Sequence, residues 1–385
     1  MSDGKSSSKK IKVLQVNKFY HPVTGGIETL VKQYSEELSA LDDIELEVLC
    51  CQNKRAKTEV ETINGVKVTR MSSLGTYFSC PLSIPFIFRF WKEAKDADVV
   101  EMHVPFPLVD FATTFSRSKA KFIIHWHSDI VKQEKVMFLV KPFMNAMLKK
   151  SSSIIVATKG HILGSKYLPP YENKCKIIPY GVDTNEFNPS KIKDGLHDIL
   201  TSKLTQKDSK KALFVGRLVY YKGVEVLVNA MKDVTDTELF ICGSGPLSDD
   251  LKAKTKELGL DSKIHFLDYL NDQELKAAYN DCDFFVLPSI QRSEAFAIVQ
   301  IEAMAYGKPV INTRLDSGVP YVSLDGETGI TVTPNSSAEL AAAINTLAHD
   351  SEICSKYGTN AKRRVEDIFS EPKIINALYE LIKSE

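Results

Sequence analysis

Short apolar runs alternate with amphipathic segments along most of the chain. Residues 27–41, for example, repeat apolar side chains at the spacing of one helix face, whereas the runs before and after them are short and rich in Val, Ile and Leu. This alternation is typical of an α/β protein with a parallel, doubly wound sheet. In the first half we predict buried strands at residues 11–17, 44–51, 66–71, 99–103, 121–127 and 153–158.

The same alternation starts again after residues 176–190, which are rich in turn formers and predict a hinge. A chain of 385 residues is also too long for one ordinary core. We therefore predict two Rossmann-like domains, residues 1–180 and 181–370, with a cleft at the carboxyl ends of both sets of strands. The strands of the second half are expected at 211–218, 237–245, 263–270, 283–289 and 308–314.

Composition narrows the class of protein. No run of 18 apolar residues is present, so no membrane-spanning helix is predicted. The first ten residues are polar and basic, which indicates a disordered tail and not a secretion signal. The seven cysteines are odd in number and lack the spacing of a metal site, which indicates reduced thiols and a cytoplasmic protein.

The formal charge is zero but unevenly spread: residues 1–180 hold 26 basic and 18 acidic side chains, and the remainder holds 23 and 31. A basic half could meet phosphates on a membrane or an acceptor, although an uneven solvated surface explains the counts equally well. Residues 81–95 and 134–153 combine large apolar side chains with Lys or Arg. Such helices lie at a membrane surface or bury their apolar residues in the core.

A strand, a loop and a helix in the second half carry a candidate phosphate site. Gly216 ends the strand, the loop holds Arg217 and Lys222, and Gly223 precedes the helix. Free N–H groups at a helix start and two cations attract phosphate, although two surface cations beside a turn would give the same pattern. The residue order is not that of a P-loop, so ATPase chemistry is not supported.

Two glutamates, Glu294 and Glu302, lie eight residues apart in a segment that we interpret as one helix from Glu294 onward. Eight helical residues rise about 12 Å, which suits two parts of one extended ligand better than two catalytic carboxylates on one bond. Glu302 could accept hydrogen bonds from a ribose diol, and Glu294 from a second polyol joined to it through a diphosphate. The alternatives are a charge that complements the helix dipole at Glu294 and a partly exposed acid at Glu302.

Backbone groups complete the predicted site. The N–H groups of Phe296 and Ala297 are expected to be free at the helix start. Gly243, at the end of the second strand of this half, would let a ligand approach closely. Gly25 and Gly26, which open a helix in the first half, would do the same, although a tight turn also explains them.

Histidines end two strands of the first half. His125 and His127 point to the same side of their strand, and His127 lies nearer the carboxyl end, where the cleft is expected. We expect His125 to be packed and regard His103 as a weaker cleft candidate. Asp129 could orient the following loop or receive an acceptor hydroxyl.

Taken together, several motifs resemble glycosyltransferase family 4, the retaining enzymes of GT-B fold, over nearly the whole chain. They are the Gly-Gly pair, HWHSD (125–129), IPYGVD (178–183), GRLVYYKG (216–223) and the E-x7-E segment within 288–311. The resemblance implies that the second domain binds the nucleotide sugar. It also implies that residues 1–180 bind the acceptor and that a C-terminal helix, about residues 371–385, crosses back to them.

The resemblance further implies a role for each matching residue. Glu294 would touch the transferred sugar, Glu302 would hold the ribose, and Arg217 and Lys222 would hold the diphosphate. His127 would lie near the C6 side of the sugar, and the Gly25-Gly26 pair beside the donor phosphate. Glu294, Arg217, Lys222 and His127 are therefore the expected catalytic residues.

The expected reaction is transfer of a hexose to a hydroxyl of a glycan or polyprenyl-linked acceptor, with retention. The residues of these motifs are most similar to those of bacterial mannosyl- and rhamnosyltransferases of surface-polysaccharide and O-antigen assembly. This similarity favours a GDP-sugar as the donor. UDP-glucose or a UDP-N-acetylhexosamine stays open as donor, as do a nucleotide-sugar 2-epimerase and a non-catalytic binding scaffold. We expect peripheral contact with the inner membrane and no nucleic-acid partner.

Two details limit the resemblance. The family usually has glycine where this chain has Ala297, so the extra methyl would narrow the pocket, and residues 315–322 also depart from the usual loop. Asp281 and Asp283 match the D-x-D metal motif of another glycosyltransferase fold. They precede a strand at its amino end, so we interpret them as a solvated turn and expect neither an essential metal nor another cofactor.

Overall fold

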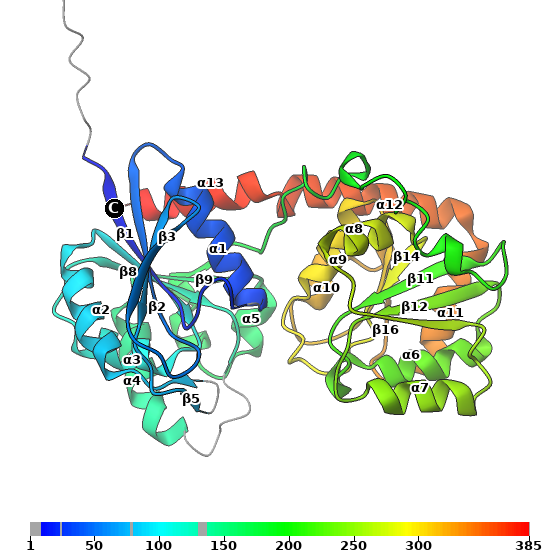
Figure 1. Ribbon diagram of the computed structural model, residues 1–385, viewed down its shortest axis with the longest axis horizontal. Helices are drawn as coiled ribbons and strands as arrows, with labels where there is room; N and C mark the ends of the chain where they lie inside the picture. The colour runs from blue at the N-terminus through cyan, green and yellow to red at the C-terminus, as the bar shows by residue number, and fades with distance from the viewer. Residues whose placement is uncertain (1–8, 24, 78–79, 130–136, 385) are drawn as a thin grey trace, which may run out of the picture. The chain divides into compact units, whose positions relative to one another are not determined.

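A computed structural model describes residues 9–23, 25–77, 80–129 and 137–384 (Figure 1). Most of the predicted disordered tail, residues 1–8, lies outside the described residues. The chain forms two compact units. Unit 1 comprises Met1–Ile178 and Ile375–Glu385, and unit 2 comprises Pro179–Ile374. The dividing point lies inside the segment that the sequence predicts to be a hinge.

Unit 1 is built on an eight-stranded sheet in the order β10-β9-β8-β7-β1-β2-β4-β3. All neighbours are parallel except β3, which pairs antiparallel with β4 at the edge. The strands are β1 (Ile11–Val16), β2 (Ile44–Cys51), β3 (Glu59–Ile63), β4 (Val66–Met71), β7 (Val99–Val104), β8 (Lys121–Trp126), β9 (Ser153–Val156) and β10 (Cys175–Ile177). A hairpin of β5 (Thr76–Tyr77) and β6 (Cys80–Pro81) is separate.

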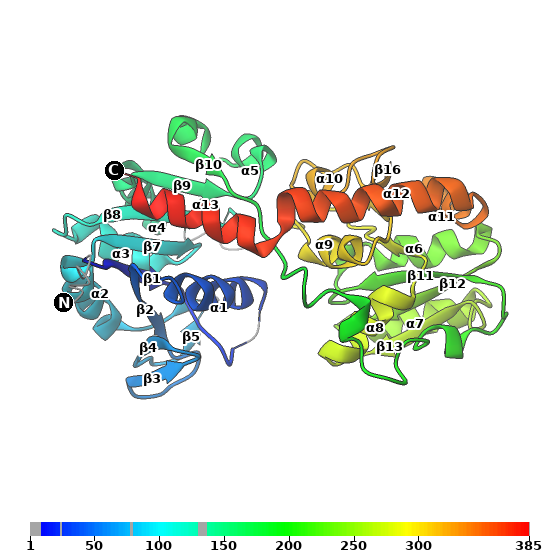
Figure 2. The same ribbon diagram turned by 90° about the horizontal axis from the view of Figure 1, so that it is seen from above.

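Helices cover both faces of this sheet (Figures 1 and 2). They are α1 (Gly26–Ser39), α2 (Ile84–Asp96), α3 (Pro107–Phe115), α4 (Met137–Lys150) and α5 (Lys159–Gly164). A further helix, α13 (Glu371–Lys383), begins in unit 2 and ends in unit 1. The part of α13 that belongs to unit 1 lies at the amino ends of the strands. Lys121 Nζ, at the start of β8, donates to the Leu381 carbonyl at 2.6 Å, and Tyr379 Oη donates to Asp43, just before β2, at 2.6 Å.

Unit 2 holds a fully parallel six-stranded sheet in the order β13-β12-β11-β14-β15-β16. Its strands are β11 (Lys210–Val215), β12 (Thr237–Cys242), β13 (Ile264–Asp268), β14 (Phe284–Val286), β15 (Val310–Thr313) and β16 (Gly329–Val332). In Figure 1, α8 and α9 lie above this sheet and α6 and α7 below it. Its helices are α6 (Val224–Ala230), α7 (Ser248–Glu257), α8 (Asp272–Asp281), α9 (Ile298–Ala305), α10 (Val319–Val322), α11 (Ser337–His349) and α12 (Ser351–Arg364).

The parallel order of each sheet decides where functional residues gather. The predicted strands carry nearly continuous apolar side chains because both faces of a parallel sheet are covered. The turns after β11, β12 and β14 meet at one edge of unit 2, and those after β1, β7 and β8 meet at one edge of unit 1. Almost all of the predicted site residues lie in these turns.

The two segments for which we weighed a membrane surface against the core contain α2 and α4, with residues 134–136 outside the described residues, and in each helix some apolar side chains are buried and others are exposed. Phe86 and Phe90 of α2 are buried, as are Met144 and Met147 of α4. Other large apolar side chains of the same helices are exposed: Ile84, Phe88, Phe138 and Leu139. Within the described ranges, no helix is both long and apolar enough to cross a bilayer.

Candidate active site

The first predicted glutamate lies in a buried ion pair. Lys222 Nζ is 2.6 Å from Glu294 Oε2, and Ser289 Oγ donates to the same oxygen at 2.9 Å. Glu294 is only 7% exposed. The pair can form because Gly223, at φ 68°, lets the turn after β11 lie against the loop after β14; a Cβ there would be 2.0 Å from the Pro288 carbonyl oxygen. Lys222 is thus already neutralised, and a bound phosphate would share it with Glu294.

The segment that holds Glu294 is not helical, which corrects our prediction of one helix from Glu294 onward. Helix α9 begins only at Ile298. Ala297, just before it, has a left-handed backbone with φ 62°, a conformation that interrupts a right-handed helix. The helical spacing expected between Glu294 and Glu302 therefore does not apply. Within the described part of the chain, no oxygen accepts a hydrogen bond from the N–H of Phe296 or Ala297.

The second glutamate is held by a tyrosine. Tyr279 Oη, on α8, donates to Glu302 Oε2, on α9, at 2.6 Å. Burial raises the pKa of Glu302, and the hydrogen bond from Tyr279 opposes that rise. Burial, followed by the neighbouring carboxylate, raises the pKa of Tyr279 well above its usual value. The tyrosine therefore stays a donor, fixes one carboxylate oxygen and leaves the second for a ligand that brings hydroxyls.

The second predicted cation, Arg217, is exposed and forms no ion pair with a described carboxylate. Gly243 has a packing role that the sequence did not predict, because a Cβ there would lie 2.1 Å from the Gly216 carbonyl oxygen. The turns after β11 and β12 therefore touch through their backbones. In unit 1, Gly25 caps α1, and a Cβ there would lie 2.2 Å from Glu28 Oε2, whereas at Gly26 nothing lies within 4 Å.

Three buried histidines gather at the carboxyl edge of the unit 1 sheet. His103 Nδ1 lies 3.0 Å from His127 Nε2, and His125 Nε2 is paired with Glu101. Burial, followed by the neighbouring histidines, lowers the pKa of His103 and of His127 well below the usual value, so both rings are neutral.

One nitrogen from each of these three rings lies within 4.8 Å of the others, which invites a metal. However, the rings of His103 and His127 are nearly parallel, with an interplanar angle of 11° and centroids 5.2 Å apart, and the 3.0 Å contact between Nδ1 and Nε2 joins them edge to edge. This contact occupies one nitrogen of each ring, and His125 Nε2 is paired with Glu101. The arrangement therefore favours a hydrogen-bonded pair of histidines over a metal site.

The three remaining acidic candidates stabilise loops. Asp129 accepts hydrogen bonds from Trp126 Nε1 at 3.1 Å and from Ser165 Oγ at 2.7 Å, which fits the loop-orienting alternative. Asp281 accepts from the backbone N–H groups of residues 200 and 201 at 2.7 and 2.8 Å, and Asp283 accepts from that of residue 211 at 2.7 Å. The Asp281 side chain is 6% exposed and that of Asp283 is 29% exposed, so the turn that we predicted to be solvated is buried at Asp281 and only partly exposed at Asp283.

Sequence reasoning missed the residues that hold the predicted ones in place. These are Ser289 beside Glu294, Tyr279 beside Glu302, and Gln15, which contacts His103. No motif marks them, because their partners come from other elements and are brought close only by the fold. A polar residue inside an otherwise apolar strand, as Gln15 is in β1, is the one signal that could have been used.

Comparison with known proteins identifies the family of this chain. Residues 198–364 match the family described as glycosyl transferases group 1, and residues 24–186 match glycosyltransferase family 4. The O-antigen chain mannosyltransferase C of Escherichia coli is 30% identical over 384 residues, covering 96% of this chain and 98% of the relative. The D-rhamnosyltransferase WbpZ of Pseudomonas aeruginosa is 31% identical over 365 residues, covering 94% of this chain and 92% of the relative.

Solved structures share the fold at lower identity. HepE of Anabaena in complex with UDP superposes with a TM-score of 0.76 at 19% identity, covering 97% of this chain and 100% of that one. WaaG, a glycosyltransferase involved in lipopolysaccharide biosynthesis, superposes with a TM-score of 0.71 at 17% identity, covering 97% and 100%. These likenesses confirm the predicted GT-B fold class.

Proposed function

Because this chain belongs to glycosyltransferase family 4 and is thus a glycosyltransferase, we propose that it transfers a hexose from a nucleoside diphosphate sugar to a hydroxyl, with retention. The observation that carries this proposal is the pair of glutamates in unit 2. Glu294 is ion-paired to Lys222 beside the turn after β11, and Glu302 is fixed by Tyr279. One carboxylate is thus available for each sugar ring of the donor, with cations for the diphosphate.

Each role in this proposal follows from charge. Arg217 and Lys222 bind the diphosphate and stabilise the negative charge that develops on it as the sugar leaves. The N–H groups of Phe296 and Ala297 and the close approach allowed by Gly243 are further parts of the proposed donor site. The donor contacts that the resemblance implies for the Gly25-Gly26 pair and for His127 stay predictions. In the same-face route that the resemblance implies, the departing phosphate helps to remove the acceptor proton.

The test is a donor panel with an acceptor from bacterial lipid extract. The relatives named mannosyl- and rhamnosyltransferase favour GDP-mannose or GDP-rhamnose, whereas HepE was solved with UDP. We expect nucleotide release from a GDP-sugar only when acceptor is present, unchanged by EDTA because we propose that no metal or other cofactor is needed. Release from UDP-sugars alone would contradict the donor assignment. Isomerised donor without acceptor would indicate an epimerase, and binding without turnover would indicate a scaffold.

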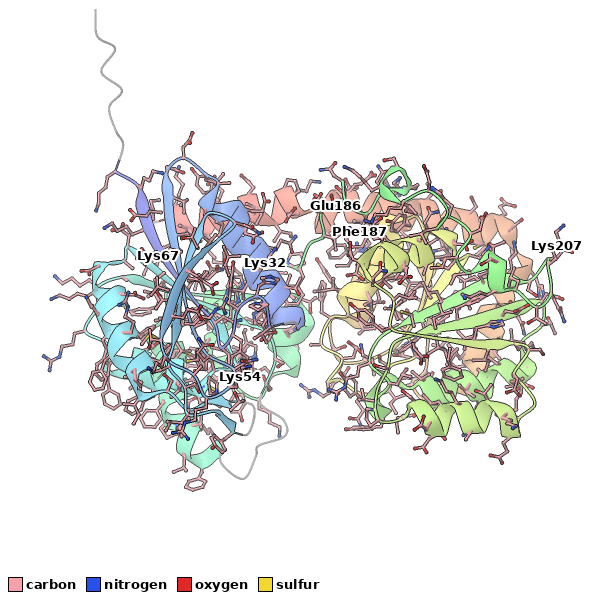
Figure 3. The ribbon with its side chains drawn as sticks, viewed as in Figure 1. Lys32, Lys54, Lys67, Glu186, Phe187 and Lys207 are labelled. Carbon is pink, nitrogen blue, oxygen red and sulfur yellow. The ribbon has the colours of Figure 1, made fainter. Side chains whose placement is uncertain are left out.

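Two variants test the site itself. Arg217→Ala is expected to lower kcat about 10- to 100-fold because the leaving group loses a cation. Glu302→Ala is expected to weaken nucleotide binding. The matched control is Lys207→Ala, since Lys207 lies before β11 at the outer edge of unit 2 in Figure 3, at the opposite end of the strand from Arg217. Wild-type rates and affinity in both site variants would overturn the assignment.

We also propose that unit 1 contacts a membrane carrying the lipid-linked acceptor, on the cytoplasmic side. Around the hairpin β5–β6 and at the starts of α2 and α4, six large apolar side chains are exposed: Leu74, Tyr77, Leu82, Ile84, Phe138 and Leu139. The loop after β2 adds Lys54, Arg55 and Lys57, and Figure 3 shows Lys54 on the lower side of unit 1, where Figure 1 places β5 and α4. Exposed apolar groups next to cations suit an anionic bilayer.

Vesicle cosedimentation tests this contact. We expect binding to vesicles that contain phosphatidylglycerol, weaker binding to phosphatidylcholine alone, and loss of binding in the double variant Phe138→Ser, Leu139→Ser. Tyr269→Ser is the control, because Tyr269 is 82% exposed but belongs to unit 2. Equal loss in both variants, or no binding by the unmodified protein, would refute the membrane contact.

A further inference from the structure

The side chain of Phe296 is buried between two aromatic rings of unit 2 that lie far from it in the sequence. Phe296 is 2% exposed. Its ring centroid lies 4.8 Å from that of Tyr180, at an interplanar angle of 69°, and 6.1 Å from that of Phe369, at 81°. Such edge-to-face pairs hold a ring in one direction and stabilise it beyond the effect of burial alone. The ring of Phe296 is therefore anchored although its backbone lies in a loop.

Tyr180 and Phe369 lie near the first and the last residue of unit 2, where the chain connects to unit 1. The two connections are hydrogen-bonded to each other. The Val182 N–H donates to the Phe369 carbonyl at 2.9 Å, and the Glu371 N–H donates to the Val182 carbonyl at 3.0 Å. We call these two segments, residues 180–182 and 369–374, the joint. The ring of Phe296 packs against both segments of the joint.

Two further features make the joint a packed element of unit 2. Gly181 lets its segments lie close together, because a Cβ there would be 2.7 Å from Ile374 Cγ1 and 3.0 Å from the Phe369 carbonyl oxygen. Arg364 links the joint to α10: its guanidinium carbon lies 5.4 Å from the Phe369 ring centroid, and its Nη2 donates to the Tyr321 carbonyl at 2.6 Å. The joint can therefore hold a side chain that packs against it.

The loop that contains Phe296 also contains Glu294 and the N–H groups proposed for the donor site. Its carboxyl end is set by Ala297, whose left-handed backbone precedes α9. Its middle is set by the Ala295 carbonyl, which accepts a hydrogen bond from the Gly318 N–H at 2.7 Å. The Phe296 ring is a third anchor. The direction of the N–H groups in this loop therefore depends on where the joint places that ring.

We propose that Tyr180 and Phe369 are positioning residues of the donor site, which hold the N–H groups of the loop in place through the ring of Phe296. The donor diphosphate, when it binds to these N–H groups, in turn stabilises the joint. This inference deepens the proposed function and rests on it for the identity of the ligand. The effect is reciprocal, because two coupled sites change each other's free energy by the same amount. It also gives a role to the motif at residues 178–183, which contains Tyr180 and Gly181.

Amide hydrogen exchange of the ligand-free protein, followed by mass spectrometry, tests the ring contact. Phe296→Leu keeps an apolar side chain and removes both aromatic pairs. We expect exchange to become about 3- to 10-fold faster in the peptides that contain the Val182 and Glu371 N–H groups, because the loss of one aromatic pair corresponds to that factor. The matched control is Phe240→Leu, since Phe240 is also buried, in β12, and stacks on His265.

The nucleotide that binds, GDP or UDP, tests the coupling. At saturation we expect it to slow exchange at the joint in the unmodified protein but not in Phe296→Leu. We also expect Phe369→Leu to raise the dissociation constant of the nucleotide and the KM for the nucleotide sugar about 3- to 10-fold, with a smaller change in kcat, although Phe369 has no proposed contact with the ligand. Phe240→Leu should change neither quantity.

Unchanged exchange at the joint in ligand-free Phe296→Leu, or equal acceleration in Phe240→Leu, would overturn the positioning role. Slower exchange around Glu294 and Glu302 with nucleotide, without an effect at the joint, would overturn the coupling and leave the donor site standing. A protein that binds neither GDP nor UDP would refute the donor site together with the coupling. The ligand-free measurement needs no nucleotide and no turnover, so it would still decide whether the joint holds the loop.

Discussion

At the scale of single residues, Ala297 shows what a substitution within a family motif costs. Its φ of 62° lies in the left-handed region, where a Cβ meets the following carbonyl oxygen. Glycine has no such conflict, and glycine is what the family usually places here. The methyl of Ala297 therefore raises the free energy of the folded backbone, in addition to narrowing the pocket as expected from the sequence.

We therefore expect Ala297→Gly to raise the free energy of unfolding by about 1 kcal/mol. Urea denaturation with and without nucleotide would measure it. The matched control is Ala303→Gly inside α9, the helix that follows Ala297, where the backbone is right-handed; there the change should lower the free energy of unfolding by about 1 kcal/mol or more. Destabilisation by Ala297→Gly would show that the methyl packs usefully.

A second residue, Asp110 on α3, predicts a dependence on pH. It is 2% exposed, its Oδ1 has no hydrogen-bond partner among the described residues, and burial raises its pKa from 3.8 to about 8. The folded state thus binds a proton that the unfolded state has lost between about pH 4 and 8. Stability should fall as pH rises through this window and level off above it.

Asp110→Asn keeps the shape of the side chain and removes the titration. We expect its gain in melting temperature over the unmodified protein to be small near pH 4, to grow up to about pH 8 and to stay constant above. Thermal unfolding followed by circular dichroism would measure both proteins. A gain that did not change with pH would mean that Asp110 is not protonated in the fold.

At the scale of elements, α8 packs against α9, and this contact lets Tyr279 hold the Glu302 carboxylate in one orientation as a hydrogen-bond acceptor. Tyr279→Phe removes the hydroxyl that fixes Glu302 and keeps the ring. We expect KM for the nucleotide sugar to rise about 3- to 10-fold with little change in kcat, because the contact orients a binding group. Steady-state kinetics would measure this.

Tyr306→Phe serves as control for that change. Tyr306 is also near Glu302, but its hydroxyl is buried with no hydrogen-bond partner among the described residues. Its removal should leave KM unchanged. An equal effect of both variants would argue that ring packing, and not the hydrogen bond to Glu302, matters.

The elements also show where sequence reasoning succeeds. The eleven predicted strands are present, because apolar runs bounded by turn formers reflect burial on both faces of a parallel sheet. The five unpredicted strands of the described residues lack this signal: β3 is an edge strand with exposed side chains, β5 and β6 have two residues each, β10 has three residues, and β16 has four. The predicted start of α9 was wrong because apolar periodicity does not reveal a residue with a left-handed backbone, such as Ala297.

At the scale of the whole molecule, the two-unit organisation was predictable because the strand–helix alternation stops and restarts. The partners of the site residues were not predictable in this way. Lys222 meets Glu294, and Tyr279 meets Glu302, only because the sheet order places β11 beside β14 and packs α8 against α9. Sequence spacing therefore identified the charged residues, whereas the fold supplied what neutralises and orients them.

The same organisation predicts two separable unfolding transitions. The proposed nucleotide contacts of Arg217, Lys222 and the two glutamates lie in unit 2, so GDP should raise the transition of unit 2 in calorimetry more than that of unit 1. Leu378 of α13, 1% exposed, belongs to unit 1, and Leu378→Ala should destabilise that transition by about 3 kcal/mol. Leu340→Ala, in the core of unit 2, should lower the transition that GDP raises more. If both variants and GDP moved one common transition together, the units would unfold cooperatively and α13 would stabilise them both.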